Sequence, residues 1–197
     1  MLTVAAAAPL AAQERGLPDR IVGSSRTVLQ HLVDSARTAG LPTAPLYDKA
    51  AEGVLKGADD DRIVVVVRSL TRELGEARDA LGPMGTSAEQ LPLLTSAASA
   101  LHAGLPVADL RRLAHRGGSQ PDASTLATAL VTLVDLVAKR VPVNVATSSI
   151  QNLIDRRATV RQFSDLRAGV DEDIAAGHAP EASVVARVRA QLGGSPP

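Results

Sequence analysis

The sequence contains no cysteine and no tryptophan, and its only large aromatic side chains are Tyr47 and Phe163. Without cysteine, neither disulfide bonds nor thiolate metal sites can form. With only these two rings for bases to stack on, the usual platform for single-stranded nucleic acid is missing. A core with so few rings must be built from Ala, Val and Leu, which favours closely packed helices over a β-sandwich.

The chain also lacks an excess of either charge, since Lys and Arg number 21 and Asp and Glu number 21. Proteins that bind nucleic acid in general rely on a positive excess that neutralises phosphates, so we expect no nucleic-acid partner. No apolar run in the 197 residues is long enough to span a bilayer as a helix, so we expect no transmembrane span. The hydrophobic fraction of 45% is typical of a folded globular chain rather than a disordered one.

The N-terminal stretch Leu2–Ala12 is apolar and rich in alanine, and Gln13-Glu14-Arg15 follows it abruptly. An apolar run that ends in small residues is typical of a secretory signal peptide. The basic residues that normally precede such a run are missing, and Leu10 is large for its place before a cleavage after Ala12. We interpret residues 1–12 as a signal-peptide remnant and predict a periplasmic or secreted protein. The alternative is a cytoplasmic protein with an Ala-rich first segment.

A short element recurs along the chain, as Ala39-Gly40-Leu41-Pro42, Ala103-Gly104-Leu105-Pro106 and, in altered form, Lys139-Arg140-Val141-Pro142. Glycine just past a helix end adopts the left-handed conformation that closes the last turn, and a proline soon after cannot continue the helix. The element therefore predicts the end of one helix and the start of the next. Fainter copies begin at Arg15 and Gly177.

Between these elements, apolar residues recur every three or four positions, which is the spacing of a helix with one buried face. We therefore predict an all-α fold of repeated helix hairpins, packed as a short solenoid or an irregular bundle. The helical domain is expected to cover residues 13–192, followed by a disordered tail at 193–197. The last predicted helix has Val185, Val188 and Leu192 on its apolar face.

The run Ile63–Val67 is β-branched throughout, which by itself indicates a buried strand. Three acidic residues, Asp59-Asp60-Asp61, precede it, and the N-terminal turn of a helix favours negative charge. Helical spacing also continues as far as Leu81, with Glu73 on the polar side. We predict a helix here, with a strand as the alternative.

No arrangement of residues indicates catalysis, a metal or another cofactor. A calcium loop that starts at Asp59 would need a glutamate at the position of Leu70. None of the four histidines has a partner at a zinc-ligand spacing. Serine-nucleophile elbows and phosphate-binding loops are also absent from the sequence.

Two groups of arginines are the candidate partner-binding residues. Arginine suits the recognition of carboxylates and phosphates. If the helix pairs stack in register, the two groups fall near corresponding turns and form a positive stripe. The ordinary alternative is a solvated surface. The candidates are Arg111, Arg112, Arg116, Arg156, Arg157 and Arg161.

Residues 36–82 resemble a segment of uncharacterised exported bacterial proteins made of repeated helices. In those proteins, a Gly-Leu-Pro element is followed by a Lys-x-x-Glu-Gly helix and then by Lys-Gly before a second helix. The matching residues are Gly40-Leu41-Pro42, Lys49 with Glu52-Gly53, and Lys56-Gly57. Further along the chain the pattern weakens, since Arg116-Gly117 stands where Glu-Gly is expected. The resemblance implies a helical fold and export, and it implies no activity.

These observations indicate a non-enzymatic exported scaffold whose stacked helix pairs bind a protein or envelope partner. An enzyme or small-ligand carrier with a pocket between helices is one alternative. Its pocket would be lined by several of Asp109, His115, Asp135 and Asp155. A homo-oligomeric structural protein is the other alternative.

Overall fold

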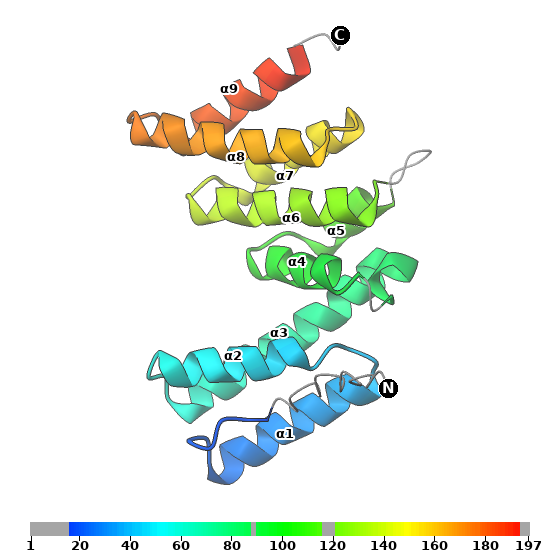
Figure 1. Cartoon of the computed structure of the whole chain (residues 1–197), viewed down its shortest axis with the longest axis vertical. Helices are drawn as coiled ribbons and strands as arrows, with labels where there is room; N and C mark the ends of the chain where they lie inside the picture. The colour runs from blue at the N-terminus through cyan, green and yellow to red at the C-terminus, as the bar shows by residue number, and fades with distance from the viewer. Residues whose placement is uncertain (1–15, 88–89, 116–120, 194–197) are drawn as a thin grey trace, which may run out of the picture. The chain divides into compact units, whose positions relative to one another are not determined.

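The computed structural model describes residues 16–87, 90–115 and 121–193. These residues form helices and connecting turns, with no strand among them, which confirms the predicted all-α fold class (Figure 1). The interpretation of residues 1–12 as a signal-peptide remnant lies outside the described residues, as do Arg116 and residues 194–197 of the predicted tail. Gly193, the first residue of that predicted tail, is the last residue of the final helix.

The chain divides into two compact units, Met1–Val67 and Arg68–Pro197, within the stretch that the sequence indicates as one helical domain. The first unit contains α1 (Gly23–Thr38), α2 (Ala44–Leu55) and the beginning of α3 (Asp60–Leu81). Its buried face is aliphatic on every helix. The buried side chains are Leu29, Val33 and Ala36 on α1, Leu46 and Ala50 on α2, and Ile63, Val64 and Val67 on α3.

The run Ile63–Val67 is helical, so the alternative of a strand is wrong. Asp60 and Asp61 occupy the first turn of α3, where their charge favours the helix. Ile63 and Val67 are buried four positions apart, whereas Val65 between them is exposed, as expected on a helix with one buried face. Helix-stabilising charge and packing thus outweigh the intrinsic strand preference of β-branched residues.

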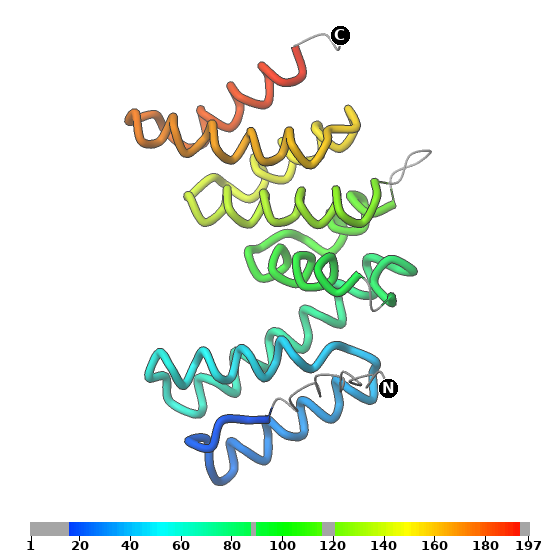
Figure 2. Tube along the Cα trace, viewed as in Figure 1, coloured from blue at the N-terminus to red at the C-terminus, as the bar shows by residue number. Residues whose placement is uncertain are grey.

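The second unit contains the rest of α3 and the helices that follow it. Its helices alternate between two layers, because α4 packs on α6 and α6 on α8, while α5 packs on α7 and α7 on α9 (Figure 2). Successive helices therefore pair across the layers. The elements are a 3-10 turn (Gly82–Gly85), α4 (Leu91–His102), α5 (Val107–Ala114), α6 (Ala123–Ala138), α7 (Val143–Asp155), α8 (Val160–Ala175) and α9 (Pro180–Gly193).

The core of the second unit lies between these layers and is built mainly from leucine, with one ring, Phe163, fully buried on α8. On α9 the predicted apolar face is shifted. Val185 is 41% exposed, whereas Val184 and Val188, four positions apart, are buried. Val188 is three positions from Val185 and four from Val184, and both spacings suit an apolar helix face, so the periodicity alone could not decide which of the two valines is buried.

Six helix ends in the described residues close in the same way, each with a residue of positive φ and a pair of backbone hydrogen bonds. After α1, for example, the Leu41 N–H donates to the Ala36 carbonyl over 2.8 Å and the Gly40 N–H to Arg37 over 3.0 Å. The predicted helix ends at these elements are therefore confirmed. The positive-φ residues are Gly40, Gly57, Gly104, Arg140, Arg157 and Gly177.

The helices of the first unit correspond to part of the second unit at a shift of 100 positions. Gly23–Thr38 corresponds in this way to Ala123–Ala138, and α3 begins at Asp60 where α8 begins at Val160. The turn residue Gly57 likewise corresponds to Arg157. The match is one of position along the chain, in helix bounds and in the residues that close the helices.

Candidate functional site

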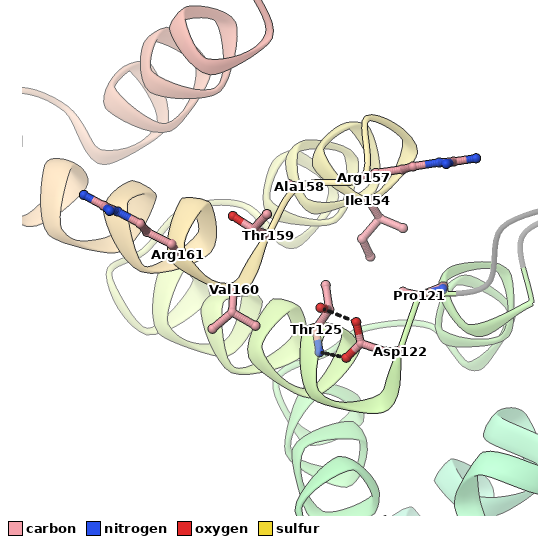
Figure 3. Close-up of a pocket in the computed structure, with 9 residues that line it drawn as sticks. All are labelled: Pro121, Asp122, Thr125, Ile154, Arg157, Ala158, Thr159, Val160 and Arg161. Carbon is pink, nitrogen blue, oxygen red and sulfur yellow. Dashed lines mark hydrogen bonds between the residues drawn. The ribbon is translucent and has the colours of Figure 1, made fainter. Parts of the chain in front are cut away.

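A surface cleft of about 520 Å³ opens where α6 begins beside the turn between α7 and α8 (Figure 3). We call it the turn cleft. Three helices and one turn contribute to it, and they all belong to the second unit. The residues that line it are Pro121, Asp122, Thr125, Ile154, Arg157, Ala158, Thr159, Val160 and Arg161.

The interior of the turn cleft is apolar and its rim is basic. In Figure 3, Ile154 and Val160 point into the space in front of the first turn of α6, while Arg157 and Arg161 extend away on opposite sides. Val160 is 40% exposed, so part of its side chain faces the cleft. The cleft therefore offers a ligand an apolar surface between two cations.

The polar groups in the walls of the turn cleft already have partners. Asp122 begins α6 and accepts hydrogen bonds from the Thr125 N–H over 2.8 Å and from the Thr125 hydroxyl over 2.7 Å. The Thr125 backbone N–H, followed by its hydroxyl, holds the pKa of Asp122 below its usual value. Thr159 forms a reciprocal pair with Gln162 at the start of α8. Both helix starts are thus capped from within.

The structure separates the predicted arginine candidates. Arg157 and Arg161 line the turn cleft, and Arg156, the residue before them, does not. The second group is not part of this cleft, since Arg111 and Arg112 lie exposed on α5 and Arg112 pairs with Asp109. Arg116 lies outside the described residues. A continuous positive stripe through both groups stays a prediction.

Arg157 has an unusual backbone conformation. Its φ of 56° is left-handed, a region that costs a residue with a side chain about 1–2 kcal/mol. Its guanidinium has no hydrogen-bond or ion-pair partner among the described residues, and Arg161 has only Asp165, 3.7 Å away. A strained, unpaired cation at the edge of a cleft is a candidate for ligand binding.

A second concave surface crosses α4, α6 and α8, and we call it the layer groove. It has a volume of about 380 Å³ and small side chains on α4, where the hydroxyls of Thr95 and Ser96 donate to carbonyls of their own helix. Val131, 40% exposed, adds apolar area to it. The lining residues are Thr95, Ser96, Ser99, Val131, Val134, Asp135, Ala138 and Arg167.

An ion network that includes two of the lining residues, Asp135 and Arg167, ties α6 to α8. Asp135 accepts from Lys139 and, over 3.2 Å, from Arg167, and Lys139 reaches Asp171 over 2.8 Å. Partial burial would raise the pKa of Asp135, but the hydrogen bonds from Lys139 and Arg167 outweigh it and leave the pKa below its usual value. Partial burial would lower the pKa of Lys139. The hydrogen bonds to Asp135 and Asp171 outweigh this effect, so the pKa of Lys139 is raised above its usual value.

Of the four residues predicted to line an enzyme or carrier pocket, Asp135 lines the layer groove. Asp109 pairs with Arg112. His115 contacts the Ala80 carbonyl through Nε2 at 2.9 Å.

In the first unit, the Lys-x-x-Glu-Gly and Lys-Gly residues form the junction between α2 and α3. Glu52 pairs with Lys49 at 2.7 Å and with Lys56 at 2.5 Å, and these hydrogen bonds, that from Lys49 first, lower the pKa of Glu52 to about 2. A Cβ on Gly53 would lie 2.7 Å from Cγ1 of Ile63, so only glycine lets α3 approach this closely. The pattern is therefore explained by helix packing in this unit.

Glu73 was expected on the polar side of α3 and is instead buried. Its carboxylate accepts from the Ser69 hydroxyl over 2.8 Å and lies 3.1 Å from Nδ1 of His102 at the end of α4. The helical spacing alone could not reveal this, because the covering residue His102 comes from another helix.

Among the described residues, no group of His, Asp or Glu is arranged to hold a metal ion, and no helix is both long enough and apolar enough to cross a membrane. Comparison of the chain with protein-family models, with curated proteins and with solved structures finds no match. The resemblance to exported helical-repeat proteins stays a prediction.

Proposed function

We propose that the protein is a non-enzymatic, exported scaffold of repeated helix pairs, and that it binds a protein or envelope partner across the layer groove. The observation that carries the proposal is a concave surface that runs over three consecutive helices of one layer. Layers of stacked helix pairs characteristically present such extended surfaces to other proteins.

The chemistry of the layer groove supports a protein partner. Small side chains such as Ser96 and Ser99 permit close approach of a partner, and Val131 supplies exposed apolar area. Packed helices lie about 8–10 Å apart, so three of them span roughly 20 Å. That distance matches a partner helix of about 13 residues. Asp135 and Arg167 add charged groups that such a segment could contact.

Export is the second part of the proposal, and it is supported by the apolar Ala-rich run Leu2–Ala12 ahead of Gln13-Glu14-Arg15. Mass spectrometry of the protein recovered from the envelope or medium of its own host tests this part. We expect a mature N-terminus at or near Gln13. An intact N-terminus in the cytoplasmic fraction would contradict export and leave the binding proposal standing.

Position-specific photocrosslinking in the host tests the groove. A photoreactive amino acid replaces Val131 in one variant and Ala190, an exposed residue of α9, in the matched control. We expect one defined partner to crosslink from position 131 and not from position 190, and the crosslink to disappear when Ser96→Arg fills the groove. Equal crosslinking from both positions would refute the groove, and a crosslink to a second copy of the chain would support a homo-oligomeric structural protein instead.

A further inference from the structure

One side of α9 is exposed and mostly apolar. The helix packs on α8 and α7 at the edge of the second unit (Figure 1). On its remaining side, exposed residues recur in pairs four positions apart, as on one face of a helix. We call this surface the α9 face. Two of its residues are charged, and the others are alanines and Val185, which is 41% exposed. The α9 face consists of Glu181, Ala182, Val185, Ala186, Arg189 and Ala190.

The two charged residues of the α9 face are unpaired. Among the described residues, neither the Glu181 carboxylate nor the Arg189 guanidinium makes a hydrogen bond or an ion pair. They lie eight positions apart, about 12 Å along the helix, which is too far for them to pair with each other. By contrast, Arg187 of the same helix pairs with Asp173 at 2.6 Å. The α9 face therefore has one anion and one cation that are free to meet charges of another molecule.

These two charges are arranged symmetrically about Val185, since Glu181 lies four positions before it and Arg189 four positions after it. When two such helices lie antiparallel about a twofold axis at Val185, Glu181 of each copy is level with Arg189 of the other. Each charged residue is then about 6 Å from the axis, measured along the helix. The α9 face is thus complementary to itself in charge, and this property favours a second copy of the chain over an unrelated partner.

The alanines permit two α9 faces to pack closely. Packed helices lie about 8–10 Å apart, and small side chains at the contact allow the shorter distance. Val185 of each copy would then supply the apolar centre of the contact, with the ion pairs on either side. One helix against one helix is smaller than a standard interface, so we expect a weak dimer with a Kd on the order of 10–100 µM.

We propose that the α9 face binds the α9 face of a second copy of the chain, as an antiparallel pair about Val185 with two Glu181–Arg189 ion pairs. Such a dimer goes beyond the proposed scaffold function and does not depend on the layer groove, because none of the residues that line the groove belongs to α9. In the host, a crosslink from position 190 to a second copy would support the dimer, whereas the partner that crosslinks from position 131 tests the groove. The two proposals can therefore fail separately.

Charge reversal tests the two ion pairs. Sedimentation velocity of the full chain should show dimers as the concentration rises from about 5 to 500 µM. Glu181→Arg and Arg189→Glu should each weaken the dimer about tenfold or more, because the twofold axis turns two attractions into two repulsions. The double variant Glu181→Arg/Arg189→Glu restores both pairs with the net charge unchanged. Its Kd should lie within about threefold of that of the original chain.

Disulfide trapping locates the twofold axis. Because the chain has no cysteine, Val185→Cys introduces a single thiol. Two copies of a residue at the axis of closely packed helices can reach the Cβ separation of about 3.5–4.5 Å that a disulfide needs. The matched control is Val131→Cys, since Val131 is 40% exposed and lines the layer groove. Under mild oxidation, Val185→Cys should form covalent dimers at least about tenfold faster than Val131→Cys.

Three results would overturn the proposal. One is a chain that stays monomeric up to about 500 µM. Another is a dimer that the single charge reversals leave unchanged, or a double variant that dimerises as weakly as the single variants. The third is a Val131→Cys variant that crosslinks as fast as Val185→Cys, which would place the contact between copies at the layer groove. All the changed residues are exposed, so each variant is expected to fold, and circular dichroism checks this.

Discussion

The replacement Arg140→Gly should make the protein more stable. Arg140 closes α6 with a φ of 69°, and at the corresponding place after α1 the residue is Gly40, with a φ of 71°. The left-handed conformation costs a residue with a side chain about 1–2 kcal/mol. Glycine avoids that strain but loses about 0.4–1 kcal/mol more through the entropy of the unfolded chain. The net gain from Arg140→Gly is therefore about 0.5–1 kcal/mol.

The reverse change, Gly40→Arg, is the matched control. A Cβ added at Gly40 has nothing within 4 Å, so a loss of stability there arises from the backbone conformation and not from a clash. We expect a loss of the same size, about 0.5–1 kcal/mol.

Urea denaturation followed by circular dichroism measures both changes, and the melting temperature should move by about 1–4 °C in opposite directions. The slope of the unfolding free energy against urea should not change. If Arg140→Gly leaves the midpoint unaltered or lowers it, the arginine side chain stabilises the fold by a contact worth more than the strain, and the reasoning is refuted.

Three further changes test the packing and the ion network. Gly53→Ala should destabilise the first unit by about 1–3 kcal/mol in urea titration, because its Cβ would lie 2.7 Å from Cγ1 of Ile63, and an unchanged midpoint would show that α3 shifts freely. Phe163→Ala should cost about 3–5 kcal/mol by the same measurement, since the ring is fully buried, whereas a loss below about 1 kcal/mol would contradict its place in the core. The pKa of Asp135 in the folded state is lowered from its ordinary value of 3.8. The stability that the Asp135 carboxylate adds, measured against Asp135→Asn, should therefore be present above pH 3.8 and disappear as the pH falls through the lowered pKa. The pKa of Lys139 is raised above 10.5, so its advantage over Lys139→Met should persist up to that pH and be lost above it, and pH-independent differences would argue against the network.

Little of the candidate site could have been found from the sequence. The six arginines form local clusters in the sequence, yet Arg157 and Arg161 line the turn cleft and the adjacent Arg156 does not. Adjacent residues in a turn point in different directions, and the directions here depend on the left-handed conformation of Arg157. The sequence does not indicate this conformation, because arginine rarely adopts it. One signal was present, since Arg156-Arg157-Ala158 stands 100 positions after Lys56-Gly57-Ala58.

The sequence by itself determined the helices and their ends, because periodic apolar positions and the conformational freedom of glycine act over a few neighbouring residues. Gly40 and Gly104 close helices where the sequence places them, and the acidic residues before Ile63 favour the helix that the β-branched run forms. Only the tertiary structure decided which surfaces stay open. Burial of Glu73 beside His102, and the open cleft at Ile154, depend on contacts between segments about 30 residues apart. Those contacts arise from how whole helices stack, and no local pattern of residues encodes them.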